Sequence, residues 1–129
     1  MLKSLYKSDM PNTIQLVELG PGRGSLMNDL LRVWAKNREM SNTNTFVYLV
    51  ESSPHLRKLQ KSLLCEKTSI IEEEPQLNQP YKSKHSPTIN IVWLRDLVEL
   101  PKKEAIHFLM ANEFFDALPF QKFQVSSFI

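Results

Sequence analysis

The stretch Gly20-Pro21-Gly22-Arg23-Gly24 constrains the fold of this chain more than any other feature. It follows a short apolar run, residues 14–19, that is rich in β-forming residues and predicts a buried strand. A chain that turns sharply from a strand into a helix needs backbone angles that side chains resist, and bare backbone lets a ligand come close. The helix is predicted to run to about Arg38, because apolar residues then recur at three- and four-residue spacing: Met27, Leu30, Leu31 and Trp34.

A second strand and helix follow the first pair. The apolar run 46–50 has the length of a buried strand and ends at Glu51. Ser53 is a good helix N-cap, and Pro54 suits the first helical position, where its missing N–H costs nothing. Three leucines share one face of the predicted helix, namely Leu56, Leu59 and Leu63.

The remainder of the chain completes an α/β pattern. Residues 72–88 contain three prolines among polar residues, so we expect an exposed connection and a surface insertion. Alternating apolar residues at 89–93 predict a further strand, and the apolar run 106–111 predicts another. The order strand, helix, strand, helix, strand, strand predicts a parallel sheet with helices on both faces, within a single domain spanning residues 1–129.

Composition excludes several classes of protein. Apolar residues make up 42% of the chain and charged residues 23%, as in ordinary globular domains. The net charge is only +2 with its basic residues scattered among acids, which argues against nucleic-acid binding. No apolar run reaches the roughly 18 residues of a membrane span. Cys65 is the only cysteine, and the three histidines share no spacing, so we expect neither a disulfide nor a metal site.

Ligands of parallel α/β sheets bind at the carboxyl ends of the strands, where the strand order reverses. The residues that follow the predicted strands are 20–24, Glu51, Asp96 and 112–116. The N–H groups at the start of the first helix can bind an anionic group. The carboxylate of Glu51 can accept both ribose hydroxyls of a nucleoside cofactor. The alternatives are an ordinary tight turn for the glycines and a solvated acid for Glu51.

The glycine spacing also separates the possible cofactors. A dinucleotide fingerprint needs a third glycine at position 25, where this chain has Ser25, and this disfavours a nicotinamide-dependent oxidoreductase. A phosphate-binding P-loop is excluded more firmly, because no Gly-Lys-Ser/Thr sequence follows the glycines.

Four short motifs follow one another in the chain. They are Val17-Glu18-Leu19-Gly20-Pro21-Gly22-Arg23-Gly24, Leu49-Val50-Glu51, Trp93-Leu94-Arg95-Asp96-Leu97 and Asn112-Glu113-Phe114-Phe115-Asp116-Ala117-Leu118-Pro119. In this order they resemble the motifs of the MidA-like family, mitochondrial complex I assembly factors that methylate protein arginine. The resemblance runs from about Ile14 to Gln124.

The resemblance implies a Rossmann-like class I methyltransferase of the mitochondrial matrix. Such an enzyme uses S-adenosylmethionine to form symmetric dimethylarginine on a core subunit of respiratory complex I. The same resemblance assigns each cofactor-binding residue to one part of the cofactor. Gly20, Gly22 and Gly24 would line its methionine part, Glu51 would hold the ribose, and Asp96 would lie near the adenine.

Arginine methylation also predicts acidic residues beside the cofactor. Guanidinium is protonated at physiological pH, with a pKa above about 12, so it must give up a proton as the methyl group arrives. Paired carboxylates can orient its planar fork, and Glu113 and Asp116 are the candidate catalytic residues. Their alternative roles are a turn cap for Glu113 and backbone hydrogen bonds for Asp116.

Members of the family are longer than this chain. We therefore expect a partial domain whose sheet is incomplete on its C-terminal side and whose methyl transfer is weak or absent. A truncated, catalytically inactive module that binds the cofactor or a partner remains the alternative.

Overall fold

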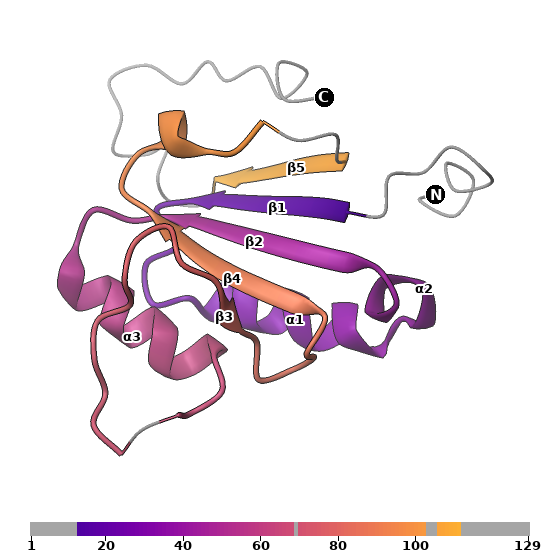
Figure 1. Cartoon of the computed structure of the whole chain (residues 1–129), viewed down its shortest axis with the longest axis horizontal. Coiled ribbons are helices and arrows are strands. Elements are labelled where there is room, and N and C mark those ends of the chain that lie inside the picture. The colour runs from indigo at the N-terminus through magenta and orange to yellow at the C-terminus, as the bar shows by residue number, and fades with distance from the viewer. Residues whose placement is uncertain (1–12, 69, 103–105, 112–129) are drawn as a thin grey trace.

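The computed structural model describes residues 13–68, 70–102 and 106–111. In this part of the chain five strands form one sheet in the order β3-β4-β2-β1-β5 (Figure 1). The strands are β1 (Thr13–Leu19), β2 (Asn44–Val50), β3 (Tyr81–Lys82), β4 (Ile89–Leu94) and β5 (Ile106–Ala111). The helices are α1 (Ser25–Lys36), α2 (Arg38–Ser41), α3 (Pro54–Leu64) and the 3₁₀ helix η2 (Leu97–Glu99).

The sheet is parallel except at one edge. β1 pairs in parallel with β2 and β5, β2 pairs in parallel with β4, and only β3 runs antiparallel to its neighbour. The chain moves outward from β1 to β2 and β4, and then returns to the other side of β1 to form β5. The strand order therefore reverses beside β1, and the turn after β1 lies at the switch point. The predicted α/β class is confirmed.

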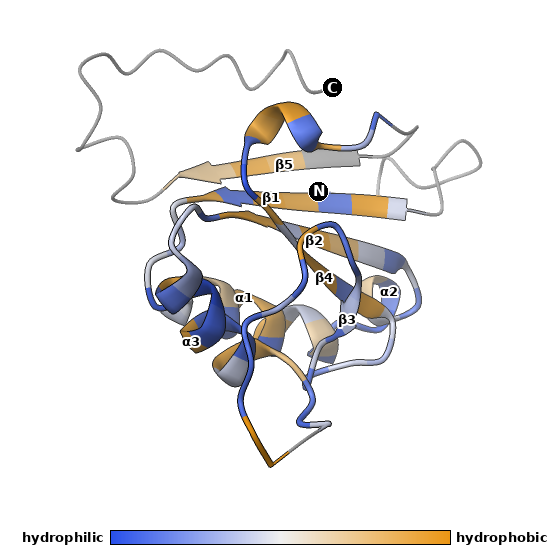
Figure 2. Cartoon of the chain, turned by 60° about the vertical axis from the view of Figure 1, so that its left-hand side comes forward, coloured by the Kyte–Doolittle hydropathy of each residue, from blue (hydrophilic) through white to orange (hydrophobic). Residues whose placement is uncertain are grey.

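The two faces of the sheet are covered differently. Helices α1, α2 and α3 pack on one face over a core that includes Leu16, Val47 and Ile91. The other face carries Val17 and Tyr48, with residues in and beside η2 packed against them. Figure 2 shows the α-helices on one side of the sheet and η2 on the other. In the described residues the three α-helices thus share one face, and the helix on the second face is the short 3₁₀ helix η2.

Helix α1 follows its predicted apolar stripe. Met27 and Leu31 are fully buried, and Leu30 and Trp34 pack against the same core. The helix ends at Lys36, two residues before the predicted end, because Asn37 adopts an extended conformation. The Asn37 side chain accepts hydrogen bonds from the backbone of the next helix, α2, and so begins a new helix instead of continuing the first.

Helix α3 begins as predicted, and the face that it buries is largely polar. The Ser53 side chain accepts a hydrogen bond from the Leu56 N–H, and Pro54 occupies the first turn. Of the three leucines that share one face, Leu59 is 36% exposed, and Leu56 and Leu63 are half-buried. The residues that α3 buries are Arg57, Gln60 and Leu64. A helix tolerates such polar burial only where hydrogen bonds replace those to water.

The segment 72–88 contains structure that the sequence does not predict. Tyr81 and Lys82 form β3, which pairs with β4. The Tyr81 ring meets the Trp93 ring edge to face, with centroids 5.9 Å apart, and the Asn78 N–H donates to the Trp93 carbonyl. A two-residue strand has no measurable alternation, so pattern reasoning misses it. That the segment is an insertion stays a prediction.

Replacing Gly24 tests the backbone constraint at the start of α1. Its φ is 88°, and an added Cβ would lie 3.5 Å from Gln60 Cγ, an ordinary contact, so backbone strain dominates the cost. We expect Gly24→Ala to lower the free energy of unfolding by about 1–2 kcal/mol, and Gly24→Asn to lower it less, because asparagine tolerates left-handed backbone. Equilibrium urea unfolding measures both variants, and wild-type stability in Gly24→Ala would contradict the expectation.

Candidate functional site

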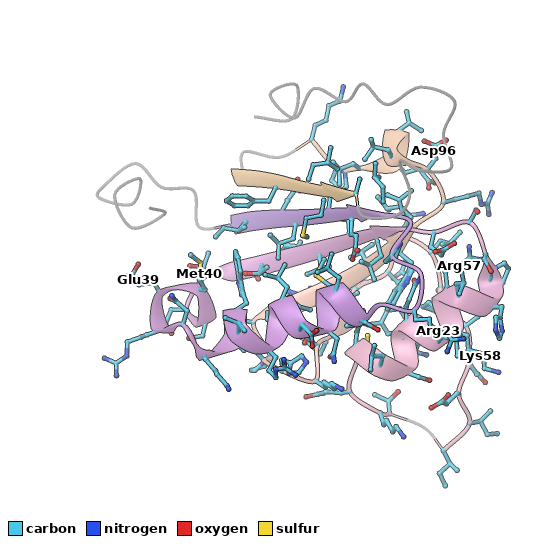
Figure 3. All side chains as sticks on the ribbon, turned by 180° about the vertical axis from the view of Figure 1, so that it is seen from behind. Arg23, Glu39, Met40, Arg57, Lys58 and Asp96 are labelled. Carbon is cyan, nitrogen blue, oxygen red and sulfur yellow. The ribbon has the colours of Figure 1, made fainter. Side chains whose placement is uncertain are left out.

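The glycine loop and Glu51 lie at the same edge of the sheet. The Gly20 N–H donates to the Val50 carbonyl at 3.0 Å, and the Glu51 N–H donates to the Leu94 carbonyl at 3.1 Å. These bonds join the carboxyl ends of β1, β2 and β4. Figure 3 shows Arg23 and Asp96 toward this end of the molecule, with Met40 at the opposite end.

The loop presents bare backbone to open space. The φ of Gly22 is +60°, and a Cβ added there would meet no atom within 4 Å. Gly24 is the N-cap of α1 and supplies no side chain to the first N–H groups of the helix. Those N–H groups and the positive end of the helix dipole favour an anionic ligand. The loop therefore has both the space and the donors for a ligand.

Glu51 is a buried acid with defined partners. It is only 7% exposed, so the alternative of a solvated acid at a strand end is wrong. One carboxylate oxygen, Oε2, accepts the Ser53 N–H at 3.1 Å, and the other, Oε1, accepts from Gln60 Nε2 at 3.2 Å. A carboxylate offers about four acceptor positions. Acceptor capacity thus remains for the hydroxyl groups of a ligand.

Gln60 is the member of the site that sequence reasoning missed. Its side chain is completely buried, and its Nε2 also donates to the Gly22 carbonyl at 2.6 Å. Its Oε1 accepts from the Trp93 indole N–H at 2.8 Å. The signal in the sequence is the helical spacing of Arg57, Gln60 and Leu64. Two of these three residues are polar, so the spacing does not look like a buried face.

Glu18 is a second residue that the sequence did not mark as functional. It interrupts the apolar run of β1, two residues before Gly20, and is 1% exposed. Its Oε1 has no hydrogen-bond partner among the described residues. Burial raises the pKa of this carboxyl to about 7. A buried acid with an unpaired oxygen beside a glycine loop is a candidate binding group for a cation.

Asp96 lies just after β4, as expected, and its side chain is exposed. Its Oδ1 accepts the Val98 N–H at 3.0 Å and caps η2, while Glu99 Oε1 accepts the N–H of Asp96 in return. That Asp96 lies near an adenine stays a prediction. The two candidate catalytic acids, Glu113 and Asp116, fall outside the described residues.

In residues 13–68, 70–102 and 106–111, no helix combines the length and apolarity of a membrane span. Nor does this part of the chain bring three or more histidine, cysteine or acidic side chains together as a metal site.

Comparison with known proteins shows the family of the chain. Residues 1–127 match the family described as a putative S-adenosyl-L-methionine-dependent methyltransferase. The chain belongs to this family. The methyltransferase fold expected from the four motifs is confirmed, and S-adenosylmethionine is the cofactor of the family.

Curated relatives of this methyltransferase family bear the name protein arginine methyltransferase NDUFAF7, mitochondrial. The protein of Xenopus tropicalis is 43% identical over 117 residues, which cover 88% of this chain and 26% of the relative. The human protein is 40% identical over 111 residues, which cover 85% of this chain and 25% of the relative. The Drosophila melanogaster homologue is 35% identical over 119 residues, which cover 92% of this chain and 26% of the relative. The chain thus spans about a quarter of the length of these relatives.

The residues present fit the cofactor of the family. S-adenosylmethionine joins a nucleoside to a methionine that carries an ammonium group and a carboxylate. The open backbone at Gly22 leaves room for the methionine part, and the N-terminus of α1 suits its carboxylate. The unpaired oxygen of Glu18 suits a cation, and the buried carboxylate of Glu51 suits two hydroxyls.

The Glu18 pKa predicts a pH dependence of stability. Burial raises this pKa from the ordinary glutamate value of 4.5 to about 7 in the folded chain, so between these values the folded state binds more protons than the unfolded state. Stability is therefore lost as the pH rises from about 4.5 to about 7. The loss attributed to Glu18 is on the order of 3 kcal/mol and is absent in Glu18→Gln.

Urea unfolding of the wild type and Glu18→Gln at about pH 5 and about pH 8 measures this difference. We expect the variant to gain stability relative to the wild type at the higher pH. An equal pH dependence in the two proteins would show that Glu18 does not titrate in this window.

Proposed function

We propose that this chain forms the cofactor-binding part of an S-adenosylmethionine-dependent protein arginine methyltransferase. The observation that carries the proposal is the pairing of open backbone at Gly22 with the buried acid Glu51, joined through Gln60 at the switch point of the sheet. Membership of the methyltransferase family supports it.

The cofactor is held along the carboxyl edge of the sheet. Gly20, Gly22 and Gly24 contact the methionine part, and Glu51 accepts hydrogen bonds from the ribose. Asp96 lies toward the adenine. Glu18 pairs with the methionine ammonium, and this positive charge favours the ionised carboxylate and so opposes the rise in its pKa that burial causes.

The substrate group is the guanidinium of a protein arginine. The names of the relatives support this choice. The bound cofactor supplies an electrophilic methyl group. The protein must hold the guanidinium in line with that group and accept its proton, and Glu113 and Asp116 are the proposed acids for this task.

The finer biological role follows the family resemblance. We place the protein in the mitochondrial matrix, where it forms symmetric dimethylarginine on a core subunit of respiratory complex I and supports assembly of that complex. The word mitochondrial in the names of the relatives supports the compartment.

Cofactor binding is tested at Glu51. Glu51→Ala removes charge-assisted hydrogen bonds to the ribose, each worth about 1.5–3 kcal/mol, so we expect the dissociation constant for S-adenosylhomocysteine to rise about tenfold or more. Calorimetric titration measures it. The control is Glu66→Ala, since Glu66 is exposed and follows the far end of α3. A change below about threefold in Glu51→Ala would remove Glu51 from the binding site.

Arginine specificity is tested by methyl transfer from labelled cofactor to a pair of peptides. One peptide contains arginine, and the other has lysine in its place. A full-length relative serves as the positive control. We expect the label only on the arginine peptide, because the planar fork of guanidinium matches paired carboxylates and an ammonium does not. Label on the lysine peptide would contradict the assignment, and cofactor binding without any transfer would favour the inactive module.

A further inference from the structure

The orientation of the Gln60 amide is fixed by its partners. An indole N–H can only donate, so the Gln60 atom 2.8 Å from Trp93 Nε1 must be the carbonyl oxygen. The amide nitrogen therefore points the other way, toward the Gly22 carbonyl and the Glu51 carboxylate. Trp93 thus decides which end of the Gln60 side chain faces the glycine loop.

Both amide protons of Gln60 are used. Their nitrogen, Nε2, lies 2.6 Å from the Gly22 carbonyl oxygen and 3.2 Å from Glu51 Oε1, so each proton has one acceptor. These acceptors lie 38 and 9 residues away in the sequence, and Trp93 lies 33 residues away. One buried side chain therefore connects the loop after β1, the acid after β2 and the strand β4.

We propose that Gln60 is a positioning residue that sets the separation between Gly22 and Glu51 in the cofactor site. The inference rests on the proposed function, in which these two groups contact different parts of one ligand. A ligand of fixed covalent length binds well only where both contacts are in place before it arrives. Gln60 itself need not touch the cofactor.

A positioning role and a purely structural role differ in how they affect the affinities for a short and a long ligand. Adenosine reaches only the Glu51 side of the proposed site, whereas S-adenosylhomocysteine reaches both Glu51 and the glycine loop. General destabilisation of the protein weakens the binding of both ligands alike. Loss of the fixed separation between Gly22 and Glu51 weakens the binding of S-adenosylhomocysteine more than that of adenosine. The reason is that the Ser53 N–H still holds Glu51, which adenosine contacts, whereas the glycine loop is no longer held.

The test compares the affinities of the 129-residue chain for S-adenosylhomocysteine and adenosine by calorimetry. Gln60→Met keeps similar bulk and removes both donors. We expect the ratio of the two affinities to fall about fivefold or more, equivalent to about 1 kcal/mol. The control is Met40→Ala, which opens the same core at the opposite end of the molecule (Figure 3) and should leave the ratio unchanged. An unchanged ratio in Gln60→Met overturns the inference.

A second variant applies if Gln60→Met does not fold. Trp93→Phe keeps an aromatic ring but removes the donor that orients the amide, together with part of the buried ring that meets Tyr81, so the ratio should fall in the same direction by a smaller factor. A wild-type ratio in folded Trp93→Phe overturns the inference.

Hydrogen exchange separates this inference from the proposed function. If the wild type binds neither ligand, the proposed function fails. Amide exchange of Gly20 and of residues 22–25 in the ligand-free chain still tests Gln60. Faster exchange in Gln60→Met than in Met40→Ala, under conditions of equal global stability, supports positioning. Equal exchange overturns it.

Discussion

The parallel pairing of β1 with the strands on both sides of it determines the rest of the site. Leu19 is in register with Val50 on one side and with Ala111 on the other. Because all three strands run the same way, the residues that follow them leave the sheet at one edge. In an antiparallel pair of seven-residue strands, Glu51 would lie at the other end of the sheet, about 20 Å from the glycine loop. No side chain of helix α3 could then join Glu51 to the glycine loop.

Helix α3 buries polar side chains where a core helix would bury apolar ones. Arg57 donates to the Glu51 carbonyl at 2.9 Å and pairs with Glu74, so the buried face of α3 also holds the connection after it. Gln60 joins the loop and the acid. Burying these groups costs desolvation that hydrogen bonds only partly return, so an apolar face would stabilise the fold at least as well. Buried polar side chains are expected beside a binding site, where the exact position of the binding groups matters more than the stability of the fold.

The sequence predicted what depends on neighbours along the chain. The strand runs, the stripe of α1, the N-cap Ser53 and the first-turn Pro54 are local patterns, and the structure has each of them. Gln60 and Glu18 were not predicted, because their importance comes from burial and from partners distant in sequence. The pairing of Gln60 with Gly22 spans 38 residues, and no periodicity encodes it. The catalytic assignment of Glu113 and Asp116 stays a prediction from chemistry and resemblance.

The central claim is that the cofactor meets the bare backbone of the glycine loop, and a titration of S-adenosylmethionine into wild type and Gly22→Val tests it most directly. The valine side chain would project into space that is open in this structure and that the proposed ligand needs. Circular dichroism first establishes that the variant is folded, because the left-handed backbone at Gly22 strains any side chain. The account predicts measurable binding to the wild type and none to the folded variant. Equal affinity in the two proteins would contradict it.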